Sequence, residues 1–459
     1  MSNPHLVWLR QDLRLADQPA FATAAASGAP VLACYVLDDE TPGDWATGGA
    51  QRWWLHHSLE ALREALEVAG GALILRRGRA ATQIARLADE VGAAAIHATR
   101  HYEPWWREAE AALGDRLTLH DGDVLAEPAS IRSGAGGAFK IYGPYFRALS
   151  HHLPPPAPIA APERIAAPSR LPPSDRIEDW GLLPTRPDWS GGFDVWQPGE
   201  AGAAAHLDRF AQEVGDYAAR RDLPSEVGTS NLSPHLHFGE VSPRQVWHGL
   251  RSGEADDKFR RELAWRDFSR NVMLADPAIG EREQRASGVA PRTGKAADAD
   301  FAAWARGHTG YPIVDAGMRQ LWATGWMHNR VRLITASFLT KHLLIEWQRG
   351  ARWFWDTLVD ADYASNGQNW QWIAGTGFDS QMFVRIMAPL TQSVKFGAAD
   401  YVRRWVPELA RLSDSDIHDP WASGAAPGGY ARPLIGHREG RERALEAYRI
   451  RTRVSGGAD

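Results

Sequence analysis

The sequence of 459 residues contains a single cysteine, Cys34. One thiol excludes an internal disulfide, a cysteine-ligated iron–sulfur cluster and a zinc knuckle, and no metal site is predicted. A lone free thiol also suits a reducing compartment, so a cytoplasmic protein is expected. The first ten residues lack a basic segment followed by a long apolar run, which argues against a secretory signal peptide.

Positive charge and long apolar runs are also lacking. The 51 Lys and Arg are outnumbered by 56 Asp and Glu, which leaves a formal net charge of -5. A nucleic-acid partner is therefore not indicated by bulk charge, and any DNA binding requires a local basic patch. No apolar stretch approaches the ~18 residues of a membrane span, so no membrane association is expected. The protein is expected to be a monomer.

Tryptophan, in contrast, is abundant, with 21 Trp against 10 Tyr and 14 Phe. Most of these indoles must pack in cores, because Trp is a large hydrophobic side chain. The chain length predicts about two or three domains.

The N-terminal part of the chain alternates between short apolar runs and segments with helical periodicity. This alternation predicts a parallel sheet with helices on both faces. No G-x-G-x-x-G motif follows the first apolar run, so a standard dinucleotide fingerprint is absent. The expected strands are 5–9, 30–37, 72–75, 93–99 and 117–119, and the expected helices are 51–69 and 81–91.

The rest of the chain divides into a proline-rich segment and a helical region. Ten of the 29 prolines fall between residues 151 and 190, a density that cannot sustain helices and predicts an extended connector. Strand signals are few beyond residue 200. The domains expected are therefore an α/β domain at 1–130, a linker at 131–200 and an all-α domain at 201–455. Within the last, helices are expected at 201–216, 259–273, 314–322, 329–346 and 438–449.

Three polar segments of the helical region carry chemistry. Residues 228–234 begin a helix behind Ser and Thr, which indicates either an ordinary N-cap or a phosphate site. Glu262, Trp265 and Arg266 share one helix face, as a surface ion pair beside a core Trp or as a base-reading acid and indole. Residues 360–372 combine two carboxylates, an amide and two indoles, a set suited to holding a flat redox ring and stacking a base.

These segments together resemble the photolyase/cryptochrome family. The motifs that carry the resemblance run through nearly the whole chain in one order, at 8–15, 228–234, 262–268, 309–316, 326–332 and 360–372. Within the family the sequence is most similar to a bacterial photolyase of cyclobutane pyrimidine dimers, of class I or the related class III. The resemblance implies a Rossmann-like α/β antenna domain joined by a long linker to an all-α domain that binds FAD.

The resemblance also implies roles for individual residues. Asp360 and Asp362 match the acids near the flavin, Arg332 matches the basic partner of Asp360, and Arg266 matches another cofactor contact. Asn366 matches the position that faces flavin N5, where an amide suits a reduced flavin and favours repair over plant cryptochrome signalling. The remaining positions implied to bind the FAD phosphates and ribityl chain are Tyr217, Thr229, Ser230, Asn231, Leu232 and Ser233.

A second set of residues matches the pocket for the damaged DNA. A dimer must be flipped out of the duplex, and its weakened pairing lowers that cost to a few kcal/mol. Two indoles supply stacking surfaces, an acid hydrogen-bonds the thymine edge, and basic residues at the rim neutralise phosphates. The pocket residues implied are Glu262, Trp265, Asn329 and Trp372, and the rim residues are Arg221, Arg330 and Arg385.

The implied reaction is light-driven repair, in which excited reduced FAD gives an electron to the dimer and the cyclobutane ring splits. Trp370 and Trp347 match the proximal and middle members of a chain that photoreduces resting flavin, although both could be core residues. The distal position falls at Gly294, so either Trp353, Trp355 or Trp405 replaces it, or photoreduction is impaired. Leu333 stands where class I enzymes carry Met, which suggests retuned repair.

The antenna and the exact activity have alternatives. Trp105-Trp106 follows Tyr102-Glu103-Pro104, where folate-binding relatives place an acidic ligand. Methenyltetrahydrofolate is the expected antenna, with a deazaflavin or flavin as the rival and an empty site as a third case. The alternative functions are a cryptochrome-like photoreceptor, which the short tail argues against, and repair of (6-4) photoproducts, which Asn329 and Leu333 argue against. A non-redox nucleotide-binding module explains only the first 150 residues.

Overall fold

The computed structural model describes residues 3–250, 253–380 and 386–455, with the backbone alone at 254–255 and 450–455. The chain forms two compact units, each treated separately below. The first unit comprises Met1–Gly215, Ser230–Pro277 and Val359–Asp362, and the second comprises Asp216–Thr229, Ala278–Leu358 and Tyr363–Asp459. No helix in the described part of the chain combines the length and apolar character needed to cross a bilayer.

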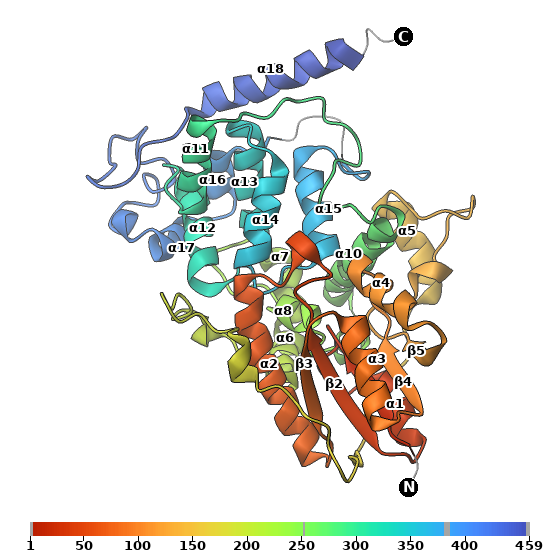
Figure 1. Cartoon of the computed structure of the whole chain (residues 1–459). Coiled ribbons are helices and arrows are strands. Elements are labelled where there is room, and N and C mark those ends of the chain that lie inside the picture. The colour runs from red at the N-terminus through yellow and green to blue at the C-terminus, as the bar shows by residue number, and fades with distance from the viewer. Residues whose placement is uncertain (1–2, 251–252, 381–385, 456–459) are drawn as a thin grey trace. The chain divides into compact units, whose positions relative to one another are not determined.

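The first unit is built on a five-stranded parallel sheet (Figure 1). Its strands lie in the order β3-β2-β1-β4-β5. The pairing register sets His5 beside Val31 on one side and beside Ala95 on the other. The expected parallel sheet is confirmed, and the strands are β1 (His5–Leu9), β2 (Val31–Leu37), β3 (Leu73–Arg77), β4 (Ala95–Thr99) and β5 (Leu117–His120).

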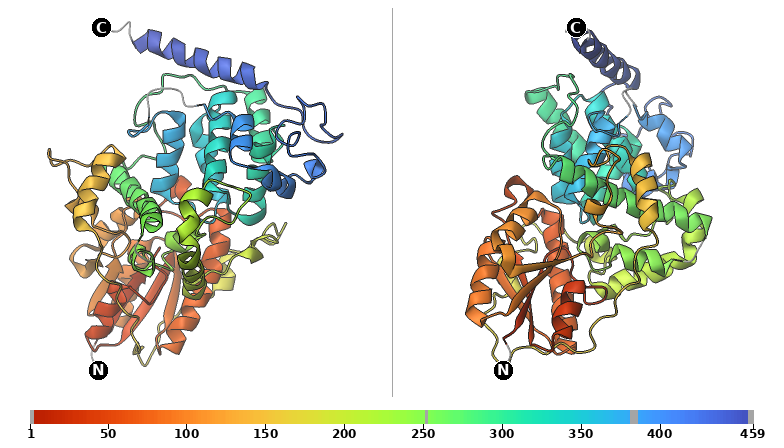
Figure 2. Two further views of the ribbon diagram at one scale, coloured as in Figure 1. Left: turned by 180° about the vertical axis from the view of Figure 1, so that it is seen from behind. Right: turned by 90° about the vertical axis from the view of Figure 1, so that its right-hand side faces the viewer.

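Helices cover both faces of this sheet, as Figure 2 shows from behind and from the side. Successive side chains of a strand point to opposite faces. Val7 and Leu9 accordingly pack with α1 (Pro19–Ala26) and α2 (Gly49–Val68) in one core cluster. Leu6 and Trp8 belong to the opposite cluster, with α3 (Ala80–Val91) and α4 (Pro104–Leu113). Near-continuous apolar strands therefore reflect burial on two sides.

The proline-rich segment is extended, as its composition predicts. Between residues 153 and 199 it forms only two short 3-10 turns, η5 (Ile177–Trp180) and η6 (Phe193–Val195). It is bound to the sheet rather than loose, because Val31 N donates to Ala166 O at 2.8 Å and Asp175 N donates to Leu75 O at 2.9 Å. Its apolar side chains, Phe193 among them, join the core cluster of α2.

The remaining helices of the first unit lie beyond the sheet in sequence. Five are found: α5 (Tyr142–Leu149), α6 (Glu200–Glu213), α8 (Ser233–His237), α9 (Pro243–Gly249) and α10 (Glu254–Ala275). Short 3-10 turns connect several of them, and α10 packs against α5.

Among its described residues the second unit forms helices joined by loops and no strand, as expected for this region. A buried carboxylate explains one of its motifs: Asp315 accepts from the Thr309 backbone N at 2.6 Å and from Tyr430 Oη at 2.8 Å. The helices are α7 (Tyr217–Arg220), α11 (Lys295–Ala305), α12 (Pro312–Thr324), α13 (Asn329–Ser337), α14 (Trp347–Thr357), α15 (Tyr363–Ala374), α16 (Pro389–Lys395), α17 (Ala399–Trp405) and α18 (His437–Ser455).

The single helix expected over 329–346 is wrong in its second half. After α13 the chain forms a π-helical turn, η8 (Phe338–His342), and Leu344 then adopts a left-handed backbone with φ of 49°. A left-handed residue ends a right-handed helix. Sequence periodicity missed this break because Leu343 and Ile345 stay buried on either side of it. Trp347 consequently begins a new helix instead of continuing the old one.

Candidate functional site

The acid and the indole predicted to read a base lie on α10 in the first unit. Trp265 is half-buried, and its ring stacks face to face on Tyr142 of α5, with centroids 3.7 Å apart and planes 5° from parallel. The Tyr142 hydroxyl donates to the Arg261 carbonyl at 3.0 Å, which fixes the phenol. One face of the Trp265 indole is thus covered by an aromatic partner, and any base that stacks on it must use the other face.

Arg266, which directly follows Trp265 on α10, pairs with a carboxylate that sequence analysis did not identify. Its guanidinium pairs with Asp123 Oδ1 at 2.6 Å and donates to the Leu236 carbonyl at 3.2 Å. Asp123 lies just after β5, beyond the carboxyl end of an edge strand of the sheet. The Arg266 charge is therefore held in a buried pair, which neither interpretation of this helix face predicted.

Asp123 also binds Arg270, which in turn reaches one of the two acids of the 360–372 segment. Arg270 Nε lies 2.8 Å from Asp123 Oδ2, and its Nη2 lies 3.1 Å from Asp362 Oδ2. Arg270 is 1 % exposed, so these are interior charges. Burial would raise the pKa of Asp123, but Arg266 and Arg270 outweigh it and hold that pKa well below its usual range. Asp362 is thus held by a series of buried ion pairs, from Asp123 through Arg270, within one unit.

The segment predicted to begin a helix behind hydroxyl caps folds differently. Helix α8 starts only at Ser233, its N-cap residue is Leu232, and no side chain caps it. Ser230 Oγ instead accepts from the Leu232 N–H at 3.3 Å, and Asn231 takes a left-handed backbone with φ of 53°. The N-cap interpretation is therefore wrong, because the hydroxyl closes a local turn before the helix. A phosphate-binding role for these residues stays a prediction.

In the second unit, one aspartate connects two of the predicted rim arginines. Arg330 Nη2 lies 2.7 Å from Asp222 Oδ2, and Arg221 Nε lies 3.9 Å from Asp222 Oδ1. The Arg221 guanidinium also sits over the Tyr217 ring, 5.1 Å from its centroid. Two predicted phosphate contacts therefore share one counter-charge, and the predicted cofactor residue Tyr217 is part of the same cluster.

Helix α15 presents the amide and one indole of the 360–372 segment to α14. Asn366 Nδ2 donates to the Ala351 carbonyl at 2.9 Å, which orients the amide. Trp370 is 3 % exposed and packs so closely on Gly350 that a Cβ there would lie 2.2 Å from the indole. Gly350 is therefore required where it stands, and the Trp370 ring has a fixed position.

From Trp370 a continuous file of rings leads to the surface of the second unit. Trp370 meets Trp304 at 6.3 Å between centroids, and Trp304 meets Phe301 at 5.6 Å. Phe301 then meets Trp353 at 6.4 Å, and Trp353 stacks on Trp322 at 6.1 Å. Trp322 is 52 % exposed, which makes it the solvent end of this ring file. Of the three indoles suggested for the missing distal position, Trp353 is the one in the file.

Comparison with known proteins places these features in a family. Two family models match, DNA photolyase over residues 5–163 and the FAD binding domain of DNA photolyase over residues 259–450. A deoxyribodipyrimidine photo-lyase of Agrobacterium fabrum is 45% identical, over 97% of this chain and 97% of that protein. The chain belongs to the photolyase/cryptochrome family. The family resemblance of the sequence is thereby confirmed.

A solved structure and a cryptochrome complete the comparison. A bacterial class III photolyase from Agrobacterium tumefaciens superimposes with a TM-score of 0.93 at 43% identity, covering 99% of this chain and 98% of that one. Cryptochrome-1 of Arabidopsis thaliana is 36% identical, over 96% of this chain and 70% of that protein. The fold of this family member, an α/β domain followed by an FAD-binding helical domain, is thus as expected.

The other residues predicted for this photolyase/cryptochrome site are divided between the two units. Asp360 is 9 % exposed in the first unit, whereas Thr229 and Arg332 belong to the second. Arg332 donates from Nε to the Met327 carbonyl at 2.7 Å, and its expected pairing with Asp360 stays a prediction. Asn329 is exposed at the start of α13, and Trp372 and Leu333 are half-buried. Arg385 lies outside the described residues.

Trp347, the predicted middle member of the photoreduction chain, borders a cavity of about 160 Å³ in the second unit. Its indole is 3 % exposed, and its Nε1 has no hydrogen-bond partner among the described residues. Trp304, which sequence reasoning missed, is the indole found in ring contact with Trp370. Its spacing in α11 resembles that of an ordinary core residue, so no sequence signal marks it.

The residues predicted at the antenna are packed into the α/β core. Trp106 meets Trp8 edge to face at 6.1 Å, and the Arg10 guanidinium lies 4.2 Å over the Trp8 ring. Tyr102 Oη donates to Glu127 at 2.6 Å, and burial raises the pKa of Glu103, which is 2 % exposed. The buried acid Glu103 and the packed indole of Trp106 are thus part of the core of the α/β domain. The identity of the antenna chromophore stays a prediction.

Proposed function

We propose that this protein repairs DNA with light, splitting cyclobutane pyrimidine dimers by electron transfer from excited reduced FAD, as a deoxyribodipyrimidine photo-lyase. The observation that carries the proposal is likeness along the full length of chains named for that activity, at 45% identity. The substrate is UV-damaged DNA with the dimer flipped into a pocket, and the enzyme acts as a monomer. The functional division at 1–130, 131–200 and 201–455 is part of the proposal.

The buried polar groups of the first unit fit a polar cofactor such as FAD. Asp360 and Asp362, two acids of this unit, are each 9 % exposed. Arg270 pairs with Asp362, and its Nη1 is buried with no hydrogen-bond partner among the described residues. Such groups are costly to bury unless something satisfies them. These acids, with Arg266, Arg332 and the residues at 217 and 229–233, would hold the cofactor. Reduced FAD, when bound, would supply an electron after it absorbs light. The chain would position the cofactor and the DNA and provide the surrounding charges.

The amide of Asn366 is arranged to tune that cofactor. Its nitrogen is committed to the Ala351 carbonyl, so its oxygen is directed away from that bond. An amide oxygen accepts a hydrogen bond from an N–H, which is the group a reduced flavin presents at N5. Asn366 therefore favours the reduced cofactor that repair requires.

The residues that the family resemblance assigns to the lesion are part of the proposal. Glu262 hydrogen-bonds the thymine edge, and Trp265 and Trp372 stack, each contributing roughly 1–3 kcal/mol. Arg221, Arg330 and Arg385 contact phosphates with Asn329 beside them. The Tyr142 stack holds the Trp265 indole in a fixed plane, so the free face of that indole is ready for a base without reorganisation.

Electrons for photoreduction enter through Trp370. Two routes are available to that indole: the ring file through Trp304 to Trp322, and the predicted route through Trp347. The ring file is favoured because its neighbouring centroids lie 5.6–6.4 Å apart up to an exposed indole. For the antenna we retain methenyltetrahydrofolate, with a deazaflavin or flavin as the alternative chromophore.

One experiment tests the function directly. Purified protein should show a flavin spectrum, and after reduction its illumination with dimer-containing DNA should restore thymines in proportion to light dose. The dark sample is the control. A normal flavin spectrum without any restoration would refute repair and favour the alternative, a cryptochrome-like photoreceptor that signals through a protein partner. A colourless protein that does not take up FAD would refute both.

A further inference from the structure

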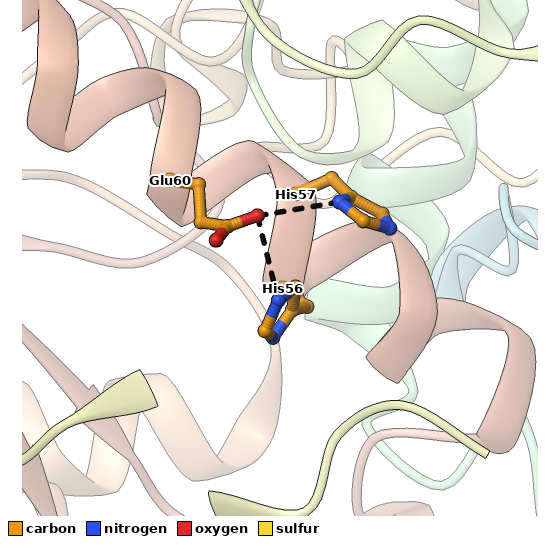
Figure 3. Close-up of side chains that lie close together, drawn as sticks. All are labelled: His56, His57 and Glu60. Atoms are coloured by element: carbon orange, nitrogen blue, oxygen red, sulfur yellow. Dashed lines mark ion pairs between the residues drawn. The ribbon is translucent and has the colours of Figure 1, made fainter. Parts of the chain in front are cut away.

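Two histidines and a glutamate gather on one side of α2 in the first unit, apart from every residue assigned above. Glu60 lies four residues after His56 and three after His57, so both imidazoles neighbour its carboxylate along the helix surface. Figure 3 shows one Glu60 oxygen between the two rings. The three ligand atoms all lie within 4.8 Å of one another.

Two of the three separations between ligand atoms match a metal site better than an ion pair, and the third, between the imidazole nitrogens, is within 4.8 Å. His56 Nε2 lies 3.4 Å and His57 Nδ1 lies 3.3 Å from Glu60 Oε2. A charge-assisted hydrogen bond is shorter, at about 2.7–2.9 Å. Tetrahedral zinc holds nitrogen and oxygen ligands at about 2.0–2.2 Å, which separates neighbouring ligand atoms by about 3.3–3.5 Å. Both measured distances fall in that range.

The surroundings hold the imidazoles in place. His57 packs edge to face on Trp53, with centroids 4.6 Å apart, and Trp53 packs in the same way on Phe193 of the proline-rich segment at 5.1 Å. His56 is 7 % exposed, and its Nδ1 is buried with no hydrogen-bond partner among the described residues. The polar interactions of the His56 ring therefore fall to Nε2, the nitrogen that faces Glu60.

We propose that His56, His57 and Glu60 bind a divalent transition metal of the zinc type, with water completing its coordination. Two imidazoles and a carboxylate are a ligand set that zinc accepts with an open position. The site lies on the α/β unit, so it would clamp one turn of α2 beside the proline-rich segment and take no part in flavin chemistry.

Zinc titration of the full-length, untagged, flavin-loaded protein tests the site. After treatment with a chelator, calorimetry with zinc chloride at pH 7.5 should show about one equivalent bound, and the melting temperature should rise with zinc. His57→Gln and Glu60→Gln should each weaken binding about 10–100-fold or more. Both side chains are about one-third exposed, so neither change disturbs the core.

Glu64→Gln is the matched control, because Glu64 is exposed one turn further along α2 and carries the same charge. It should leave zinc affinity and flavin content unchanged. The proposal is overturned if no zinc binds below millimolar concentration, if binding survives both test substitutions, or if Glu64→Gln weakens it equally. Repair activity is not the readout, so the result is independent of the proposed function.

Discussion

Asp267 is a buried acid that should make the stability of this protein depend on pH. It lies on α10 with no exposed surface; its Oδ2 accepts from the Leu125 N–H at 2.8 Å, and its Oδ1 has no partner among the described residues. Burial raises its pKa to about 7, with Arg266 and Arg270 opposing part of that rise. The substitution Asp267→Asn removes the titration and keeps a carbonyl oxygen for Leu125.

The sign and size follow from linkage. The folded carboxyl, with a pKa of about 7 against 3.8 for the free group, binds a proton more strongly than the unfolded one. Its proton-linked stabilisation is therefore complete only below about pH 4 and is lost as pH rises to 7. At 1.36 kcal/mol per pKa unit the whole effect is at most about 4 kcal/mol, of which about 2.6 kcal/mol is lost between pH 5 and pH 8.

Urea unfolding of wild type and Asp267→Asn, followed by tryptophan fluorescence at pH 5 and pH 8, measures this loss. The variant should gain about 2–3 kcal/mol relative to wild type on going from pH 5 to pH 8, since all other titrating groups are common to both proteins. Asp257→Asn, at an exposed position of the same helix, should show no such change. A stability difference that is equal at both pH values would refute the reasoning.

Three further predictions concern the proposed activity. Glu262→Ala should lower the yield of restored thymine per absorbed photon while flavin content stays normal; loss of flavin would place Glu262 in the cofactor site. Trp304→Phe or Trp353→Phe should slow the photoreduction of oxidised flavin, measured by absorbance under blue light, and should leave repair by chemically reduced protein intact. Trp405→Phe, the control, should have no effect on photoreduction. If only Trp347→Phe slowed photoreduction, the ring file would not be the route. Asp222→Asn should remove the carboxylate that Arg221 and Arg330 share and so tighten DNA binding. The slope of the logarithm of the binding constant against the logarithm of salt concentration should become steeper by about 1–2, measured by fluorescence anisotropy. An unchanged slope would mean that Asp222 does not compete with phosphate.

The sequence predicted those features that depend on local patterns. The five strands were found because short apolar runs mark them, and β1 has the expected bounds. In the second half, periodicity predicted α6, α10, α12, α13 and α18, and it missed α14, α15 and the shorter helices. The helix prediction was wrong at Leu344, where apolar periodicity continues although the backbone becomes left-handed. The N-cap prediction was wrong at Ser230, because its hydroxyl accepts from the Leu232 N–H, which is nearer than the start of the helix.

The site was harder to predict because its order comes from distant pairs. Asp123 precedes its partner Arg266 by 143 positions, and no local pattern marks it as the group that holds α10. Tyr142 and Trp304 likewise resemble core aromatics until the fold sets them against Trp265 and Trp370. A family resemblance proposes which residues face the ligand, and it does not identify the residues that position them.

The 360–372 segment illustrates how separate supports can fix one short stretch of chain. Asp362 belongs to the first unit and is anchored by Arg270, whereas Asn366 and Trp370 belong to the second and are anchored by the Ala351 carbonyl and the bare backbone of Gly350. An interior ion pair is sensitive to loss of either charge, and a tight backbone contact is sensitive to a single added methyl group. Arg270→Met should therefore disturb the acids while the Trp370 ring keeps its packing, and Gly350→Ala should displace the indole while the acids keep their partner. Asp362 and Trp370, eight positions apart, are thus held by separate supports, which under the proposed function would allow flavin binding and electron supply to vary separately in one chain.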